Sequence, residues 1–228
     1  LYLNRHVRSQ GGAEARGLGG SVFEGLTQTL GSRYLLGIGL FIWLYATLST
    51  FLYFEQAHIV KAAIEDSDTR TRLFAMIDLA VNLLTLLFQL LITGRIMQKF
   101  GVAAALAAMP ALLAAGFMLL AIAPVLPVLV MTQVVRRAGN YAVTRPAREV
   151  LYTVVPRSSK YKAKNFIDTF VYRAGDQVGA WSYAAMSWVG LTLSGLAFSM
   201  VPLGFVWLGT SLWLGHKQKA LAAKAGGS

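Results

Sequence analysis

The sequence contains no cysteine and few charged residues. Without cysteine the chain can have no disulfide framework, no thiolate nucleophile and no cysteine-based metal site. Charged residues make up 14% of its 228 residues and hydrophobic residues 56%, whereas a soluble domain has roughly 25% charged residues. A soluble core does not need so much apolar surface. The composition therefore excludes a water-soluble enzyme and predicts a membrane protein.

Residue types that build catalytic and metal sites are also scarce. The three histidines, His6, His58 and His216, are far apart and have no metal-ligand spacing. No Ser/His/Asp grouping converges, and the glycine-rich segment Leu18–Ser21 lacks the Lys-Ser or Lys-Thr that ends a phosphate loop. We therefore expect a protein that is not an enzyme and that holds no metal and no cofactor.

Long apolar runs predict the architecture. A membrane-spanning helix needs about 20 mostly apolar residues. Six stretches qualify: Tyr34–Val60, Leu73–Thr93, Val102–Pro124, Val125–Tyr152, Asn165–Ser187 and Val189–Leu214. The expected fold is all-α and polytopic, with a six-helix transmembrane domain over residues 34–214. Residues 1–33, rich in glycine and arginine, are expected to form a cytoplasmic linker and residues 215–228 a cytoplasmic tail. Because the first residue is Leu1 and not methionine, we expect the chain to start inside a larger protein or to follow processing.

The basic residues predict the orientation, because Lys and Arg concentrate in short cytoplasmic loops of membrane proteins. Most of them lie in residues 1–33, 94–101, 145–164 and 215–228, whereas residues 61–72 carry basic and acidic residues together. Both termini are therefore expected in the cytoplasm. Two interpretations of residues 145–164 stay open. The segment is either the topology signal, with contacts to anionic lipids, or an electrostatic funnel for a substrate.

Polar residues are distributed unevenly among the predicted helices. Charges at membrane depth are costly and usually face a partner or a water-filled cavity. The third and sixth helices are almost wholly apolar, whereas the second carries Asp78 and Asn82 on one face and the fourth carries Arg137 and Asn140 on one face. We expect helices one, two, four and five to enclose a polar cavity and helices three and six to face lipid. This pattern fits two inverted three-helix repeats.

The depth of the charges indicates a substrate site. At 1.5 Å per residue, Arg136, Arg137 and Asp176 lie about 16–18 Å inside a roughly 30 Å core. We expect Asp176 to pair with Arg136 or Arg137 across the cavity. The surplus of arginine predicts an anionic substrate, because the guanidinium matches phosphate and carboxylate. The alternative is a structural ion-pair network that locks the helices together. The candidate substrate-binding residues are Glu55, Asp78, Asn82, Arg136, Arg137, Asn140, Arg173 and Asp176.

Three features of the sequence occur together: the polar linker before the first span, the two triplets of spans, and GRIMQKFG (Gly94–Gly101) between the second and third spans. In this combination the chain resembles the carboxy-terminal half of a major facilitator superfamily transporter. More specifically, RPAREVLY (Arg145–Tyr152), KYKAKNFID (Lys160–Asp168) and YRAGDQVG (Tyr172–Gly179) are similar to the ATP/ADP translocase branch. YFEQAHIVK (Tyr53–Lys61) loosely resembles a glutamate-bearing segment of that branch. The residues that match by position are Glu55, Lys61, Arg148, Glu149, Tyr152, Lys164, Asp168 and Arg173. Where the branch has a lysine after Arg-x-Gly this chain has Asp176, and Arg145 stands in place of an acid.

The resemblance implies half of a twelve-helix transporter in the bacterial inner membrane. Such a module moves an anionic solute, with a nucleotide as one candidate, by alternating access. Arg148, Glu149, Lys164 and Asp168 are expected to form its cytoplasmic gate. Its expected partners are the lipid bilayer, a missing amino-terminal six-helix half or a second copy, and the anionic small molecule; no nucleic acid is expected. The alternative is a membrane anchor or assembly subunit that retains the fold but transports nothing.

Overall fold

The computed structural model describes residues 22–91 and 93–226, and this part of the chain is helical throughout, with short turns between the helices. The all-α prediction is confirmed. In chain order the elements are α2 (Val22–Gly31), α3 (Arg33–Ala63), α4 (Ser67–Leu91), α5 (Thr93–Ile122), α6 (Leu126–Gly139), the π-helical η1 (Asn140–Thr144), α7 (Arg145–Leu151), the 3₁₀ turn η2 (Tyr152–Val154), α8 (Arg157–Phe166), the π-helical η3 (Ile167–Val171), α9 (Tyr172–Trp188) and α10 (Leu193–Gly226).

Four of the six predicted spans are confirmed as helices long and apolar enough to cross a membrane. They are α3, α4, the Met97–Ile122 part of α5, and α10. The fourth and fifth predicted spans are helical as well, but η1 and η3 divide each of them into shorter helices. Length and apolar composition therefore do not identify these two segments as spans.

The helix ends follow local sequence signals. Ser32 caps α3, since its side chain accepts a hydrogen bond from the Leu35 amide. Asp66 precedes α4 and accepts hydrogen bonds from the Thr69 hydroxyl at 2.6 Å and the Thr69 amide at 2.7 Å. These bonds favour the charged carboxylate and lower the pKa of Asp66. Pro127 lies in the first turn of α6, where a residue without an N–H group is tolerated.

The packing order of the helices is that of two related triplets. Helix α3 packs against α9 and α10, α6 packs against α4 and α5, and α5 packs against α10. Helices α3, α4 and α5 of the first triplet correspond in order to α6–α7, α8–α9 and α10 of the second. The contacts of α3 with α9 and α10 then correspond to those of α6 with α4 and α5, and the α5–α10 contact corresponds to itself. Helix α3 is the most buried of the four long apolar helices, and its Phe41 ring lies 5.4 Å from the buried Trp207 ring of α10.

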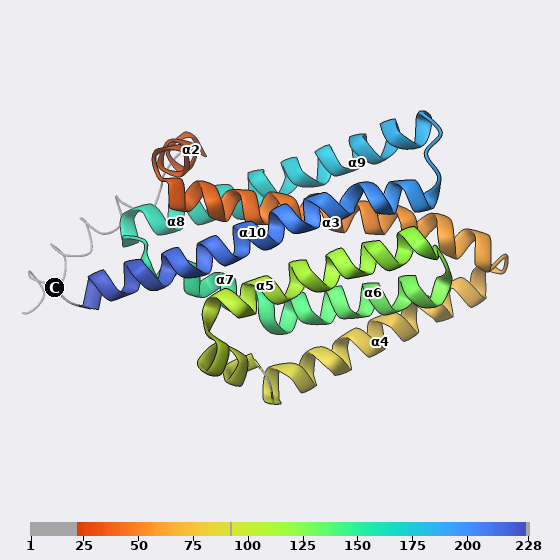
Figure 1. Ribbon diagram of the computed structural model, residues 1–228, viewed down its shortest axis with the longest axis horizontal. Helices are drawn as coiled ribbons and strands as arrows, with labels where there is room; N and C mark the ends of the chain where they lie inside the picture. Colours follow the sequence, from red (N-terminus) through yellow and green to blue (C-terminus); the bar gives the residue numbers. More distant parts are fainter. Residues whose placement is uncertain (1–21, 92, 227–228) are drawn as a thin grey trace, which may run out of the picture.

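Turns and basic segments lie at opposite ends of the bundle (Figure 1). The turns at residues 64–66, 123–125 and 189–192 gather at one end, whereas α2, α8 and the end of α10 lie at the other. Within the predicted linker, α2 packs against α8, and Lys162 pairs with Glu24 at 2.7 Å. Residues 1–21 of the linker are outside the described part of the chain. Helix α10 continues through most of the predicted tail, to Gly226.

Candidate functional site

A cavity of about 710 Å³ lies between α3, the α6–η1–α7 segment and the η3–α9 segment. Its lining joins residues distant in sequence: Tyr45, Arg136, Arg137, Asn140, Tyr141, Arg145, Arg148, Asp168, Thr169, Tyr172, Arg173 and Asp176. Five of the predicted substrate residues and two of the predicted gate residues are among them. The lining is dominated by arginine and tyrosine, which suits a polar ligand.

Both π-helical turns contribute to this lining. Asn140 and Tyr141 belong to η1, and Asp168 and Thr169 belong to η3. A π turn contains one residue more than an α turn, so it shifts the direction of the side chains that follow and frees backbone groups from the regular ladder. Such turns are frequent at functional sites. The two interruptions therefore lie where the helices face the cavity.

Pro146 explains one of the freed groups in η1. Proline has no N–H, so it cannot donate to the carbonyl of Ala142 four residues earlier. The Thr93 hydroxyl donates to that carbonyl at 2.7 Å, and the Gln89 amide donates to the neighbouring Tyr141 carbonyl at 3.2 Å. Side chains of α4 and α5 thus satisfy the irregular backbone, as buried polar groups require.

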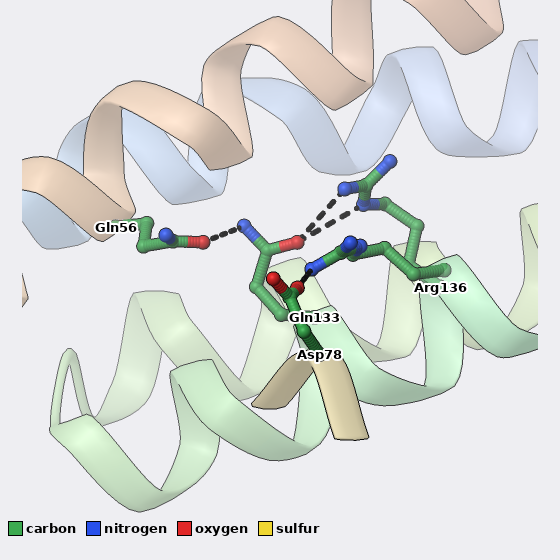
Figure 2. A network of polar contacts seen from close by, with 5 residues as sticks. Gln56, Asp78, Gln133 and Arg136 are labelled. Atoms are coloured by element: carbon green, nitrogen blue, oxygen red, sulfur yellow. Dashed lines mark hydrogen bonds and ion pairs between the residues drawn. The ribbon is translucent and has the colours of Figure 1, made fainter. Parts of the chain in front are cut away.

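Arg136 reaches from α6 towards α3. Its guanidinium donates to the Gln133 side-chain oxygen at 2.8 Å, to Ser49 at 3.2 Å and to Tyr45 at 3.5 Å. Figure 2 shows Gln133 between Arg136 and Gln56, whose side-chain oxygen accepts a hydrogen bond from the Gln133 amide. Only neutral oxygens contact this guanidinium among the described residues. Its positive charge is therefore held in place but not neutralised.

The predicted pairing of Asp176 with Arg136 or Arg137 is wrong. Arg137 pairs with Asp78 of α4 at 2.5 Å, because residues 136 and 137 project about 100° apart around α6 and so face different helices. Asp176 lies 3.8 Å from Arg173 on its own helix and accepts a hydrogen bond from the Thr50 hydroxyl at 3.1 Å. Asp176 thus has a nearer partner than the two arginines of α6 that depth suggested.

The four predicted gate residues form two ion pairs between neighbouring segments, and two of the four residues line the cavity. Lys164 pairs with Glu149 at 2.6 Å, and Arg148 lies 3.6 Å from Asp168. Both contacts join α7 to the α8–η3 segment. Arg148 and Asp168 also line the cavity. Two ionic contacts therefore join these segments beside the cavity.

Three predicted substrate residues lie outside the cavity lining. Asn82 is exposed on α4, and Asp78 reaches the site only through its ion pair with Arg137. Glu55 is completely buried within α3. Position along the helix and a shared helix face predicted these residues, and neither shows whether that face points to the cavity, to the core or to the exterior.

Five of the lining residues were not among the predicted site residues: Tyr45, Tyr141, Arg145, Thr169 and Tyr172. Tyr141 and Arg145 are four residues apart, and the Arg145 guanidinium lies over the Tyr141 ring at 4.4 Å. That spacing was a usable signal, because residues four apart share a helix face. The Tyr45 and Tyr172 rings come from different helices, 6.3 Å apart, and nothing in the sequence indicates their approach.

The cavity carries an excess of positive charge. Five arginines and two aspartates line the described site, and Asp78 neutralises one further arginine from outside the lining. Arg136 and Arg145 have no carboxylate partner within the described residues. Two guanidinium groups are thus available to an anion. The described residues contain no group of three or more His, Asp or Glu that could hold a metal ion.

The sequence matches no protein-family model and no curated protein.

Proposed function

We propose that this chain is a module of a secondary membrane transporter that moves an anionic solute by alternating access. The observation that carries the proposal is the arginine-rich cavity inside an apolar helix bundle. A positive surplus among apolar helices is costly unless something compensates it. A bound anion supplies that compensation and defines what the cavity selects.

The donor geometry favours an anion with several oxygen atoms. Arginine presents a planar fork of N–H donors that binds carboxylate or phosphate in a bidentate manner. Arg136 and Arg145 belong to consecutive parts of one broken helix, and Tyr45 and Tyr172 add hydroxyl groups from two other helices. A carboxylate or phosphate group placed between these donors would contact three helices at once.

Transport, as opposed to simple binding, is supported by the helix arrangement. The packing order is compatible with inverted three-helix repeats, and transporters of that kind bind substrate at discontinuous helices near the bilayer midplane. In this proposal α6–η1–α7 and α8–η3–α9 are the fourth and fifth spans. The chain then corresponds to one six-helix half of a major facilitator-type transporter, as the motifs suggest, and a second half or a second copy completes the cavity.

The identity of the anion follows from a ligand panel. The purified full protein is heated with ATP, ADP, inorganic phosphate and organic acids, and its thermal unfolding is recorded. A ligand that binds only the folded state stabilises it by about 2.7 kcal/mol at a hundredfold excess over its Kd. We expect one anion class to stabilise the protein, and ATP or ADP is the candidate that the motif resemblance suggests.

Matched arginine variants separate the cavity from general charge effects. Arg136→Gln and Arg145→Gln should each abolish the stabilisation, whereas Arg95→Gln, which removes an arginine outside the cavity, should preserve it. Stabilisation that survives both cavity variants would contradict the proposed site. If no anion of the panel stabilised the protein, the result would favour the membrane anchor or assembly subunit.

A further inference from the structure

Glu55 is a buried acid that the proposed anion site does not use. Its side chain lies within α3 and is 0% exposed. Neither carboxylate oxygen has a hydrogen-bond partner among the described residues, and no cation of that part of the chain lies within ion-pair distance. A buried ionised carboxylate normally requires a cation or several donors. Glu55 therefore fits its surroundings as the neutral, protonated acid.

The acid is separate from the cationic cavity. Arg136 contacts Ser49 and Asp176 contacts Thr50, which precede Glu55 on α3 by six and five residues. At 1.5 Å per residue, these two contacts lie about 8–9 Å from Glu55 along the helix axis, towards the start of α3. In the predicted orientation Glu55 is on the outer side of the cavity. Its charge state thus affects the bundle without involving a direct contact with the anion.

Two ionisable residues, Tyr183 and His58, lie between the face of α3 that carries Glu55 and the protein surface. Phe51, Glu55 and His58 lie on one side of α3, because residues three and four apart are neighbours on a helix. The Tyr183 ring of α9 lies 5.4 Å from the Phe51 ring, and its hydroxyl lies 3.1 Å from His58 Nδ1. Tyr183 is buried, whereas His58 is exposed. The two residues lead from the acid towards the end of the bundle that holds the turns.

Few other titratable groups face this region. Helix α10 contributes none between Leu193 and Gly215. Helix α9 contributes Tyr183 and, two turns away, Asp176, which is bonded to Thr50; α6 contributes Arg136, which is bonded to Ser49. Among the described residues, no other base lies beside Glu55 to accept its proton. Proton exchange must therefore involve water or the His58–Tyr183 pair.

We propose that Glu55 is a proton-binding site that exchanges with the outer solution through Tyr183 and His58 when α3 and α9 move apart. The proton adds to a carboxylate oxygen to give the neutral acid, and it leaves again as that acid is exposed to water. Tyr183 accepts one proton and donates another, so its own charge is unchanged over the transfer. This inference rests on the proposed function for the helix movement, and it makes the proton the coupling ion.

Infrared difference spectroscopy on the full protein in lipid tests the site without any anion. We expect the carbonyl stretch of a protonated carboxylic acid to disappear reversibly as the pH is raised. Glu55→Gln should abolish this band, Glu55→Asp should shift it, and Glu65→Gln, at an exposed loop glutamate, should leave it unchanged. A band that survives Glu55→Gln, or that is present at every pH, would overturn the proposal.

A kinetic variant tests the path. Tyr183→Phe keeps the aromatic packing but removes the hydroxyl beside His58, so the band should remain and respond severalfold more slowly to a pH jump. An unchanged rate would refute the route through Tyr183. Because anion-dependent thermal stabilisation is measured separately, failure of the proton site and failure of the anion site are distinguishable.

Discussion

Arg136 and Arg137 show that adjacent identical residues can have different surroundings. Arg136 points to neutral oxygens of α3 and its own helix, whereas Arg137 is paired with Asp78 of α4. The rotation of about 100° between successive helical residues separates them. Arg136 is therefore the one whose charge is available to a ligand, and Arg137 is the one that links two helices.

The Arg137–Asp78 ion pair is expected to contribute little stability. Its side chains are 34% and 55% exposed, and exposed pairs typically contribute about 0.2–1 kcal/mol because water screens them. A double-mutant cycle with Arg137→Gln and Asp78→Asn, measured by reversible unfolding, should give a coupling energy in this range. A coupling above about 2 kcal/mol would mean that the pair is desolvated in the membrane and locks α4 to α6.

Tyr34 provides a buried contact between the two triplets. Its hydroxyl donates to the Leu151 carbonyl at 2.8 Å, and both residues are buried. Tyr34→Phe should lower the free energy of unfolding by about 1 kcal/mol, since a buried hydrogen bond is lost while the ring stays. Tyr53→Phe, at a tyrosine that is 63% exposed, serves as the control and should change stability little. Equal losses in both variants would show that the Tyr34 bond makes no specific contribution.

At the scale of elements, the apolar runs predicted helices better than they predicted interruptions. Hydropathy averages over a window, so it located α3, α4, α5 and α10. It did not indicate η1 or η3, because a π turn depends on which donors satisfy a few carbonyls. The Thr93 and Gln89 hydrogen bonds that satisfy the backbone of η1 come from residues about 50 positions away. Such partners follow only from the packed fold.

Two glycines of α9 allow its close packing against α3. A Cβ atom at Gly175 would lie 2.7 Å from the Trp43 carbonyl oxygen, whereas at Gly179 the nearest atom would be 3.1 Å away. Gly175→Ala should therefore destabilise the protein by about 1–3 kcal/mol, as overpacking does, and Gly179→Ala should cost less. Gly209→Ala, on α10 with no atom within 4 Å, should be neutral or stabilising by up to about 1 kcal/mol. Unfolding of the three variants checks the order, and equal costs at positions 175 and 209 would contradict it.

At the scale of the whole molecule, the sequence predicted that the first, fourth and fifth helices meet at the site, but it also placed α4 there, and α4 contributes no lining residue. The sequence did not predict how the side chains divide the charge. Arg136, Asn140, Arg173 and Asp176 were predicted from depth and helix face and do line one cavity. Asn82 was predicted from its helix face and Glu55 from its position in the first span, and neither lines the cavity. The difference is rotational, since a few tens of degrees about a helix axis decide whether a side chain faces the cavity, the core or the exterior.

The orientation of the bundle can be tested because the protein has no native cysteine. Ser67→Cys and Ala220→Cys each introduce a single exposed thiol, near the start of α4 and near the end of α10. In intact cells a membrane-impermeant maleimide should label position 67 only, and labelling at position 220 should require permeabilisation. The reverse pattern would place both termini outside and would invert the predicted topology.

The unbalanced arginines of the cavity have an electrical consequence. After Asp168, Asp176 and Asp78 are counted against the five lining arginines, two positive charges remain. One elementary charge that crosses the whole membrane field changes the energy by about 2.3 kcal/mol per 100 mV. In the proposed transporter, an inside-negative voltage draws the empty cavity towards the cytoplasm, whereas a doubly charged anion cancels this bias. Membrane voltage would then determine whether the empty transporter faces the cytoplasm or the outside. The loaded transporter would change between these conformations almost independently of voltage.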